Sequence, residues 1–200
     1  MKTPILVPAL IIGASLSLTG CISFGAKPPP HLLTLEAASA PAVGAQRDSA
    51  TAKSIVVKVP TIPASLATAR IPVQESPTTI AYVPDALWSE PPANLFARLL
   101  ADTLTAQTGM VVLSSIESIG DPSASLAGEL RAFGIDATTR EAVVTYDAAL
   151  SRAGGTSVEK RRFEARVPVA AIDAATSAPA LNQAANRVAG EVATWVAAGR

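Results

Sequence analysis

The stretch "EAVVTYDAALSRAGGTSVEKRRFEARVPV", residues 141–169, decides the fold of this chain. Apolar and polar side chains alternate on both sides of its Gly-Gly pair. The apolar positions are Val144, Tyr146, Ala148 and Leu150, then Phe163, Ala165 and Val167. A period of two is the pattern of a half-buried strand, and a glycine turn between two such runs joins them antiparallel. The stretch therefore predicts an antiparallel meander with one solvated face.

Further extended segments flank the meander. Branched and alternating residues predict strands at 31–37, 54–60, 69–76, 78–83, 110–115 and 125–136. Pro72 and Pro84 place their strands at an edge, at a bulge or near a strand end, because proline donates no ladder hydrogen bond. The segment 38–53 is small, polar and punctuated by proline and glycine, which predicts a loop.

Two amphipathic helices complete the pattern. Residues 88–109 carry a leucine-rich face, with Pro92 suited to the first turn and Gly109 to the end. In 173–198, apolar residues recur at spacings of four and three, which fits a helix on a sheet or a short coiled coil; packing on a sheet is preferred. The order predicts an α+β fold: a mixed, mainly antiparallel sheet with two amphipathic helices packed on one face.

Composition narrows the function. The 200 residues are 49% hydrophobic and 16% charged, which suits one domain plus its ends. Sixteen basic residues balance sixteen acidic ones, so no nucleic-acid partner is expected. One histidine, His31, and one cysteine, Cys21, provide no metal ligand set and no nucleophile–base pair. We expect no catalytic residue, no cofactor and no metal, and we expect His31 to be solvated at the start of the domain.

The N-terminus contains "LSLTGCIS", residues 16–23, after Lys2 and an uncharged apolar run. Leu18-Thr19-Gly20-Cys21 matches the bacterial lipobox, which predicts a cleaved lipoprotein signal peptide at 1–20. Residues 21–30 would then be the lipidated Cys21, carrying acyl chains such as palmitate, and a proline-rich tether. Ile22 in place of aspartate favours the outer membrane over the inner one. An ordinary secretory signal or an uncleaved signal anchor is the alternative.

The densest run of charges is "EKRRFEAR", residues 159–166. Such a run usually forms the exposed face of a strand and protects a sheet edge. The functional alternative is a surface that docks an acidic partner or lipid headgroups, with Lys160, Arg162 and Arg166 as its cations. The sequence leaves both interpretations open.

A resemblance rests on "YVPDALWSEPPANLFARLLADTL", residues 82–104. Tyr82, Trp88, the Glu90-Pro91 turn and the leucine pattern that follows resemble the signature of the ABC-type transport auxiliary lipoprotein family. The likeness extends over residues 31–198, which would form the auxiliary α+β domain. Two features depart from the family pattern: His31 replaces an early aromatic residue, and segment 69–80 is rich in proline and threonine.

The resemblance implies a non-catalytic envelope lipoprotein, which together with Ile22 favours the periplasmic face of the outer membrane over the inner membrane. Its partners would be an ABC permease and its ATPase, reached through an MCE-type substrate-binding protein, in a system that moves lipids or other hydrophobic molecules. Tyr82 and Trp88 would be packing anchors or part of a partner surface, and self-association is compatible with this role. The alternatives are a structural or outer-membrane assembly lipoprotein and, more weakly, an acyl-handling enzyme.

Overall fold

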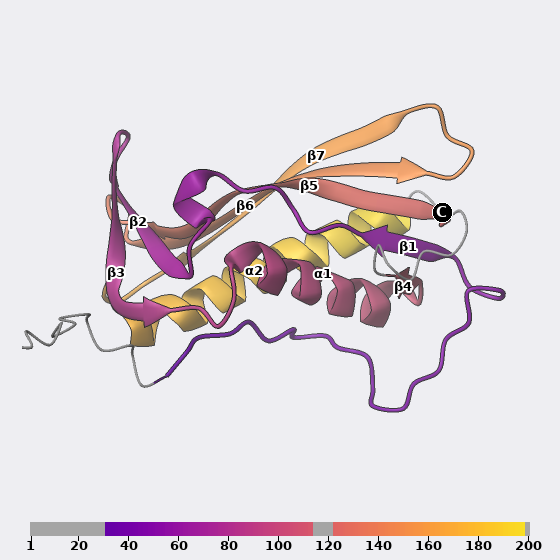
Figure 1. Ribbon diagram of the computed structural model, residues 1–200, viewed down its shortest axis with the longest axis horizontal. Helices are drawn as coiled ribbons and strands as arrows, with labels where there is room; N and C mark the ends of the chain where they lie inside the picture. The colour runs from indigo at the N-terminus through magenta and orange to yellow at the C-terminus, as the bar shows by residue number, and fades with distance from the viewer. Residues whose placement is uncertain (1–30, 114–121, 199–200) are drawn as a thin grey trace, which may run out of the picture.

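Strand β5 (Ala124–Asp136) is the centre of a seven-stranded mixed sheet in the computed structural model of the chain, which describes residues 31–113 and 122–198 (Figure 1). On one side β5 pairs antiparallel with β6 (Glu141–Arg152), which pairs with β7 (Val158–Pro168). The other side of β5 is shared by two parallel neighbours. Its first residues pair with β1 (Ser54–Val57) and its last with β2 (Arg70–Ser76).

Two short extensions widen the sheet beyond these neighbours. β4 (Val111–Leu113) lies parallel to β1, and β3 (Thr79–Leu87) lies antiparallel to β2. A 3-10 turn, η1 (Ala64–Leu66), joins β1 to β2. Strands β3, β4 and β7 are therefore the edges of the sheet among the described residues.

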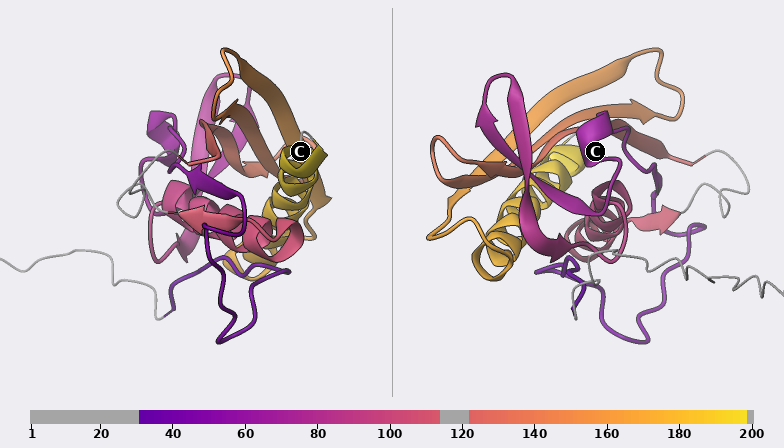
Figure 2. Two further views of the ribbon diagram at one scale, coloured as in Figure 1. Left: turned by 90° about the vertical axis from the view of Figure 1, so that its right-hand side faces the viewer. Right: turned by 60° about the vertical axis from the view of Figure 1, so that its left-hand side comes forward.

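Helices α1 (Pro92–Thr108) and α2 (Ala174–Ala198) lie on the same face of the sheet (Figures 1 and 2). Pro92 is the first residue of α1, and Gly109 ends it with a φ of 70°. Aromatic side chains of both helices pack against aromatic side chains of the sheet. Phe96 of α1 packs edge-on against Tyr146 with 5.3 Å between centroids, and Trp195 of α2 packs against Phe163 at 5.6 Å. The predicted α+β fold with two helices on one face is confirmed, and α2 packs on the sheet as preferred.

The alternation in 141–169 sets which side chains reach this core. Ala142, Val144, Tyr146, Ala148 and Leu150 of β6 are all buried on the helix side. The Tyr146 hydroxyl donates to the carbonyl oxygen of Ala127 at 3.0 Å, and burial raises the pKa of this phenol. One hydrogen bond thus satisfies a polar atom inside an otherwise apolar layer, as buried polar groups require.

The positions of the prolines and of one glycine explain how β2 meets β5. Pro72 lies at a register shift between β2 and the edge strand β3, and Pro84 lies in β3 itself, so both satisfy the expectation for strand prolines. A Cβ on Gly134 of β5 would overlap the carbonyl oxygen of Pro72. Glycine is therefore needed where the two backbones approach.

The expected first strand at 31–37 is wrong. Only Leu33 forms a bridge, with Trp88, through hydrogen bonds of 2.8 Å from Leu33 N–H to the Leu87 carbonyl and from Ser89 N–H to the Leu33 carbonyl. Further along, the backbone at Glu36 and Ala38 bonds to side chains of α2 in place of a neighbouring strand. We call residues 31–38 the strap. It runs past the helices on the side away from the sheet (Figure 1).

Asparagine side chains of α2 hold the strap. Asn182 Oδ1 accepts the N–H of Glu36 at 2.9 Å, and Asn186 Oδ1 accepts the N–H of Ala38 at 2.7 Å. Asn186 Nδ2 also donates to the Glu36 carbonyl at 2.8 Å. Leu33, Leu35 and Ala37 pack against the core between these bonds. Residues 39–53 then form the predicted loop.

The remaining predictions differ from the structure only at element ends. The strand expected at 54–60 ends at Val57, and the one at 78–83 continues to Leu87. The one expected at 110–115 is present as Val111–Leu113, and its last two positions, 114–115, lie outside the described residues. η1 was not predicted.

The edge strand β7 is partly capped. The Arg187 guanidinium of α2 donates to the Arg166 carbonyl at 3.3 Å, and Pro168, which has no backbone N–H, is the last residue of the strand.

Candidate functional site

The outer face of the sheet, opposite the helices, carries the cations that the sequence singled out. Lys160, Arg162 and Arg166 alternate along β7 with the buried residues Phe163, Ala165 and Val167. The strand-face interpretation of this run is therefore correct. The docking interpretation depends on what surrounds the three cations.

Carboxylates from β5 and β6 surround two of them. Arg162 makes a bidentate pair with Asp147, at 2.6 and 2.7 Å. Arg166 bonds Glu164 at 2.8 Å and lies 3.3 Å from both Asp136 and Glu141. No ion pair is present for Lys160 among the described residues. The face is thus a lattice of opposite charges, in contrast to the basic patch that the sequence run suggested.

Arg131 of β5 extends this lattice to a third strand. It lies at the bulge where β5 shifts register against β6, 3.3 Å from Glu129 and 3.7 Å from Asp147. The ion pairs form two neighbouring clusters, which we call together the ionic ladder: Glu129, Arg131, Asp147 and Arg162 in one, and Asp136, Glu141, Glu164 and Arg166 in the other. Because Arg131 and Arg166 each lie near more than one carboxylate and Arg162 is held by a bidentate pair, the side chains are held in defined positions.

The ladder shifts the protonation of its members. The Arg162 hydrogen bond lowers the pKa of Asp147, and the Arg166 hydrogen bond lowers the pKa of Glu164, which also accepts from Thr145 Oγ1 at 2.9 Å. Hydrogen bonds to Glu164 first, and then to Glu141 and Asp136, raise the pKa of Arg166. All of these groups stay charged at neutral pH.

The ladder predicts a loss of stability in acid. Glu164 has a folded pKa below its ordinary value of 4.5, so its contribution is present above that value and lost as pH falls through the folded pKa. Because Glu164 and Arg166 are about two-fifths exposed, we expect Glu164→Gln to cost only about 0.5 kcal/mol at pH 7 and less at pH 3. Urea unfolding of the wild-type and Glu164→Gln chains at pH 7 and pH 3 measures this difference in the free energy of unfolding. Glu75→Gln, outside the ladder, is the control; an equal cost for Glu164→Gln at both pH values would contradict the argument.

A groove lies next to the ladder, between β7 and the β2–β3 hairpin. Its volume is about 220 Å³. Ala132, Gly134 and Val143 are small or apolar residues along it, and Ile80, which is 44% exposed, lines it from β3. Arg131, Asp136, Glu164 and Arg166 line it as well. The groove therefore combines an apolar lining with charged groups of both signs, an arrangement suited to an aliphatic side chain in a polar surround.

The two aromatic residues of the 82–104 signature have different environments. Trp88 is 1% exposed and packs edge-on against Phe133, with 5.5 Å between centroids. It is a packing anchor, and its burial removes it from the candidate partner surface. Tyr82 is half-buried on β3, and the Arg70 guanidinium lies over its ring at 4.5 Å. The guanidinium covers one face of the ring, and the half-buried Tyr82 keeps part of its surface accessible.

Sequence reasoning missed most of the ladder and the groove. Glu164, the carboxylate nearest to Arg166, lies in the same charged run on β7, but Asp147, Asp136 and Glu141 come from β5 and β6. The pairing Asp147↔Arg162 in the β6–β7 register brings the first of these to its arginine. The predicted pairing of 141–152 with 157–169 contained this information. The position of Arg131 in the ionic ladder could not be predicted in this way, because Arg131 lies at a bulge in β5 that no sequence pattern indicated.

Other expectations on the site concern His31 and Cys21. His31 is exposed at the start of the strap, as expected. Cys21 lies outside the described residues. Within residues 31–113 and 122–198, no group of three or more His, Cys, Asp and Glu side chains is placed to hold a metal ion. No helix in the same part of the chain has the length and apolar character needed to cross a bilayer.

Comparisons with known proteins agree with this architecture. A crystal structure of a Xanthomonas campestris protein of the DUF330 family aligns with a TM-score of 0.70 at 19% identity, covering 84% of this chain and 95% of that one. A second crystal structure, of an uncharacterized protein, aligns with a TM-score of 0.63 at 17% identity, covering 72% and 92%. At these identities the likeness shows the fold alone. A search of curated proteins gave no match.

A family comparison goes further than the fold. The family described as ABC-type transport auxiliary lipoprotein component matches residues 33–193, which include the strap from Leu33, the whole sheet and most of α2. The match contains the 82–104 signature with Tyr82 and Trp88. The chain therefore belongs to the ABC-type transport auxiliary lipoprotein family.

Proposed function

We propose that the chain is a non-catalytic, periplasm-facing lipoprotein component of an ABC/MCE-type transport system. The system would move lipids or other hydrophobic molecules across the cell envelope, and this chain would be its membrane-anchored docking partner. The observation that carries the proposal is the family match over residues 33–193, whose description names a transport auxiliary lipoprotein. Self-association is compatible with this role.

The anchor in this proposal is Cys21. Residues 1–20 are the cleaved signal peptide, residues 21–30 are the acylated cysteine and its tether, and residues 31–198 are the docking domain. The lipobox Leu18-Thr19-Gly20-Cys21 supports this division. Because one acyl chain holds a protein only weakly, the palmitate and diacylglycerol chains expected at Cys21 would act together. Ile22 supports the outer membrane as the site of anchoring.

The docking surface in this proposal is the outer face of the sheet. Its ladder presents charges of both signs in fixed positions, which favours selection among protein partners over general attraction to an acidic surface. The groove beside it offers a place for an aliphatic side chain. Of the predicted surface, Lys160, Arg162 and Arg166 are exposed and Tyr82 is half-buried, so all of them except Trp88 have accessible surface. The permease and ATPase would be reached through an MCE-type protein bound here.

Purification of the full-length, C-terminally tagged lipoprotein from detergent-solubilised envelopes tests this function. We expect an MCE-type protein to co-purify, together with the permease and ATPase of one ABC system. Lys160→Glu should lower that recovery because it reverses a charge on the outer face, whereas Lys58→Glu, exposed just after β1, should not. Recovery of outer-membrane assembly proteins in place of transport components would instead support the structural alternative.

A further inference from the structure

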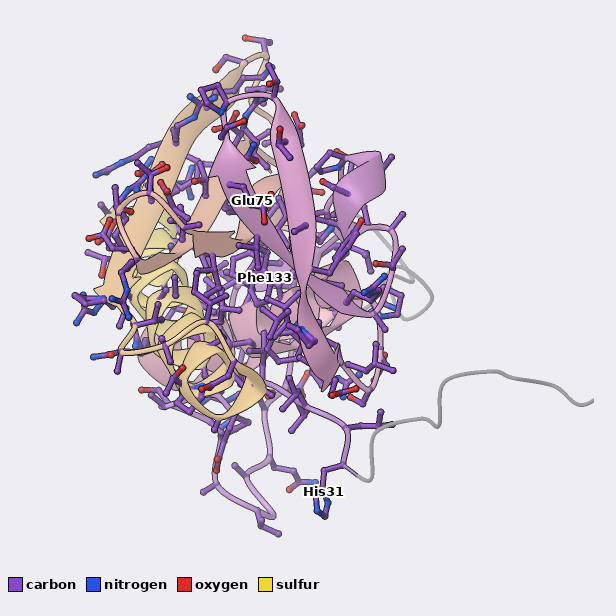
Figure 3. All side chains as sticks on the ribbon, turned by 90° about the vertical axis from the view of Figure 1, so that its left-hand side faces the viewer. His31, Glu75 and Phe133 are labelled. Carbon is purple, nitrogen blue, oxygen red and sulfur yellow. The ribbon has the colours of Figure 1, made fainter. Side chains whose placement is uncertain are left out.

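The chain leaves the described domain on its helix side. Residue 31 begins the strap, and Figure 3 shows His31 on one side of the molecule and Glu75, on β2, on the other, with Phe133 between them. Figure 1 shows the strap below the helices and the sheet above them. A tether that ends at His31 therefore approaches the domain from the side opposite the outer face of the sheet.

The strap is attached to the domain at several independent points. At Leu33 it bonds the backbone before α1, and at Glu36 and Ala38 it bonds the two asparagines of α2. Leu33, Leu35 and Ala37 pack against the core, and the residues between them are exposed. Polar bonds thus fix the register of the strap while alternate side chains bury apolar surface. The strap therefore packs on the helix layer with the alternating side chains of a strand, although it is not part of the sheet.

Chain length makes this attachment decisive for orientation. Nine residues lie between Cys21 and His31, and this segment spans at most about 35 Å when extended. A domain of this size has a radius of gyration of about 15 Å, so the tether is comparable with the domain it holds. If the strap were detached, the free chain would continue to β1 at Ser54, and its extended reach would exceed about 100 Å. A tether of that length would leave the domain free to turn over.

We propose that the strap fixes how the domain stands on its membrane, with the helix layer toward the bilayer and the outer face of the sheet turned away from it. This inference rests on the acylation of Cys21 in the proposed function. Protein partners then meet the ionic ladder and the groove without competition from the anchoring bilayer. The strap is a positioning device for the docking surface.

The charge of the outer face supports this orientation. The ladder and Lys160 together hold at least as many carboxylates as cations, so an anionic bilayer has no net attraction for the face. The cations are Arg131, Lys160, Arg162 and Arg166, and the carboxylates are Glu129, Asp136, Glu141, Asp147 and Glu164. Nothing in this balance opposes the orientation that the strap imposes.

Energy transfer from labelled protein to the bilayer tests the inference. Cys21 is the only cysteine, so His31→Cys and Glu75→Cys each give the acylated full-length protein one free thiol for a donor dye. The protein is placed in vesicles of phosphatidylethanolamine and phosphatidylglycerol that carry an acceptor lipid. We expect higher transfer from position 31 than from position 75. Equal transfer, or more from position 75, in the wild-type background would overturn the proposal.

Two insertions separate the role of the strap from tethering alone. The first insertion places about twenty Gly/Ser residues between Pro30 and His31 and so lengthens the tether. We expect the difference in transfer between positions 31 and 75 to be lost, because the domain can then turn over. The same insertion between Gly44 and Ala45 lies after the strap, in an exposed turn, and should preserve the difference because the strap still holds the tether. If both insertions abolish the difference in transfer, the strap does not fix the orientation of the domain, and the proposal is wrong. Protein that fails to bind vesicles at all indicates instead that Cys21 is not acylated, which would contradict the proposed function.

Discussion

The Cys21→Ala chain is expected to carry no fatty acid and to keep its N-terminal segment uncleaved. The reason is chemical: the thiol of Cys21 is the only one in the sequence, and lipoprotein processing begins by adding a diacylglycerol to such a thiol. In the wild-type chain, the acyl chains would be what holds the tether in a bilayer after cleavage. Metabolic labelling with a fatty-acid analogue, with the mass of the purified chain, measures both effects.

A conservative change nearby gives the control for this prediction. Thr19→Ala keeps a small side chain two residues before the cysteine, so labelling and cleavage should match the wild-type chain. Incorporation of the analogue into Cys21→Ala would refute the assignment of this site. An unlabelled wild-type chain would do the same and would favour an ordinary secretory signal or an uncleaved anchor.

Replacing Phe133 with alanine is expected to destabilise the domain by about 3–5 kcal/mol. Phe133 is 1% exposed, lies on the central strand β5, and packs edge-on against the equally buried Trp88. Truncation leaves a cavity that backbone movement cannot close, because Gly134 and Pro72 are already in contact beside it. A domain with a total stability of about 5–15 kcal/mol would lose a large part of it.

Urea unfolding followed by tryptophan fluorescence measures this loss, since Trp88 reports directly on the site. Ile80→Ala removes an aliphatic side chain from the exposed outer face and should change stability by less than about 0.5 kcal/mol. A cost for Phe133→Ala as small as that for Ile80→Ala would mean that Trp88 and Phe133 are not the anchors of the core.

Local patterns were sufficient for most of the fold. The strand 141–152 has the predicted bounds, and the neighbouring strand and both helices begin and end within a few residues of expectation. In each case the periodicity is long and bounded by glycine or proline, so the signal lies in the segment itself. The conformation of the strap could not be predicted from its own residues. They alternate as in a strand, but the groups that bond to the strap are Asn182 and Asn186 of α2, about 150 positions away.

The candidate site shows the same division. The charged residues of β7 could be placed on an exposed face from alternation, but except for Glu164, which lies on β7 itself, the carboxylates that neutralise them come across the register from β5 and β6. Trp88 and Tyr82 are alike in a sequence motif, and only tertiary packing makes one a core residue and leaves the other half-buried. Burial is a property of the assembled layers, so no local pattern distinguished them.

The fastening of Glu36 and Ala38 to α2 also has a consequence for the order of assembly. Contacts that join residues this far apart in sequence form late, because a long loop must close before they contribute. α2 also supplies a large share of the cover over β6 and β7, and it ends at Ala198. A chain exported N-terminus first would therefore hold an open sheet until its final helix arrives. The part of the strap at Glu36 and Ala38 can dock only after α2 is in place.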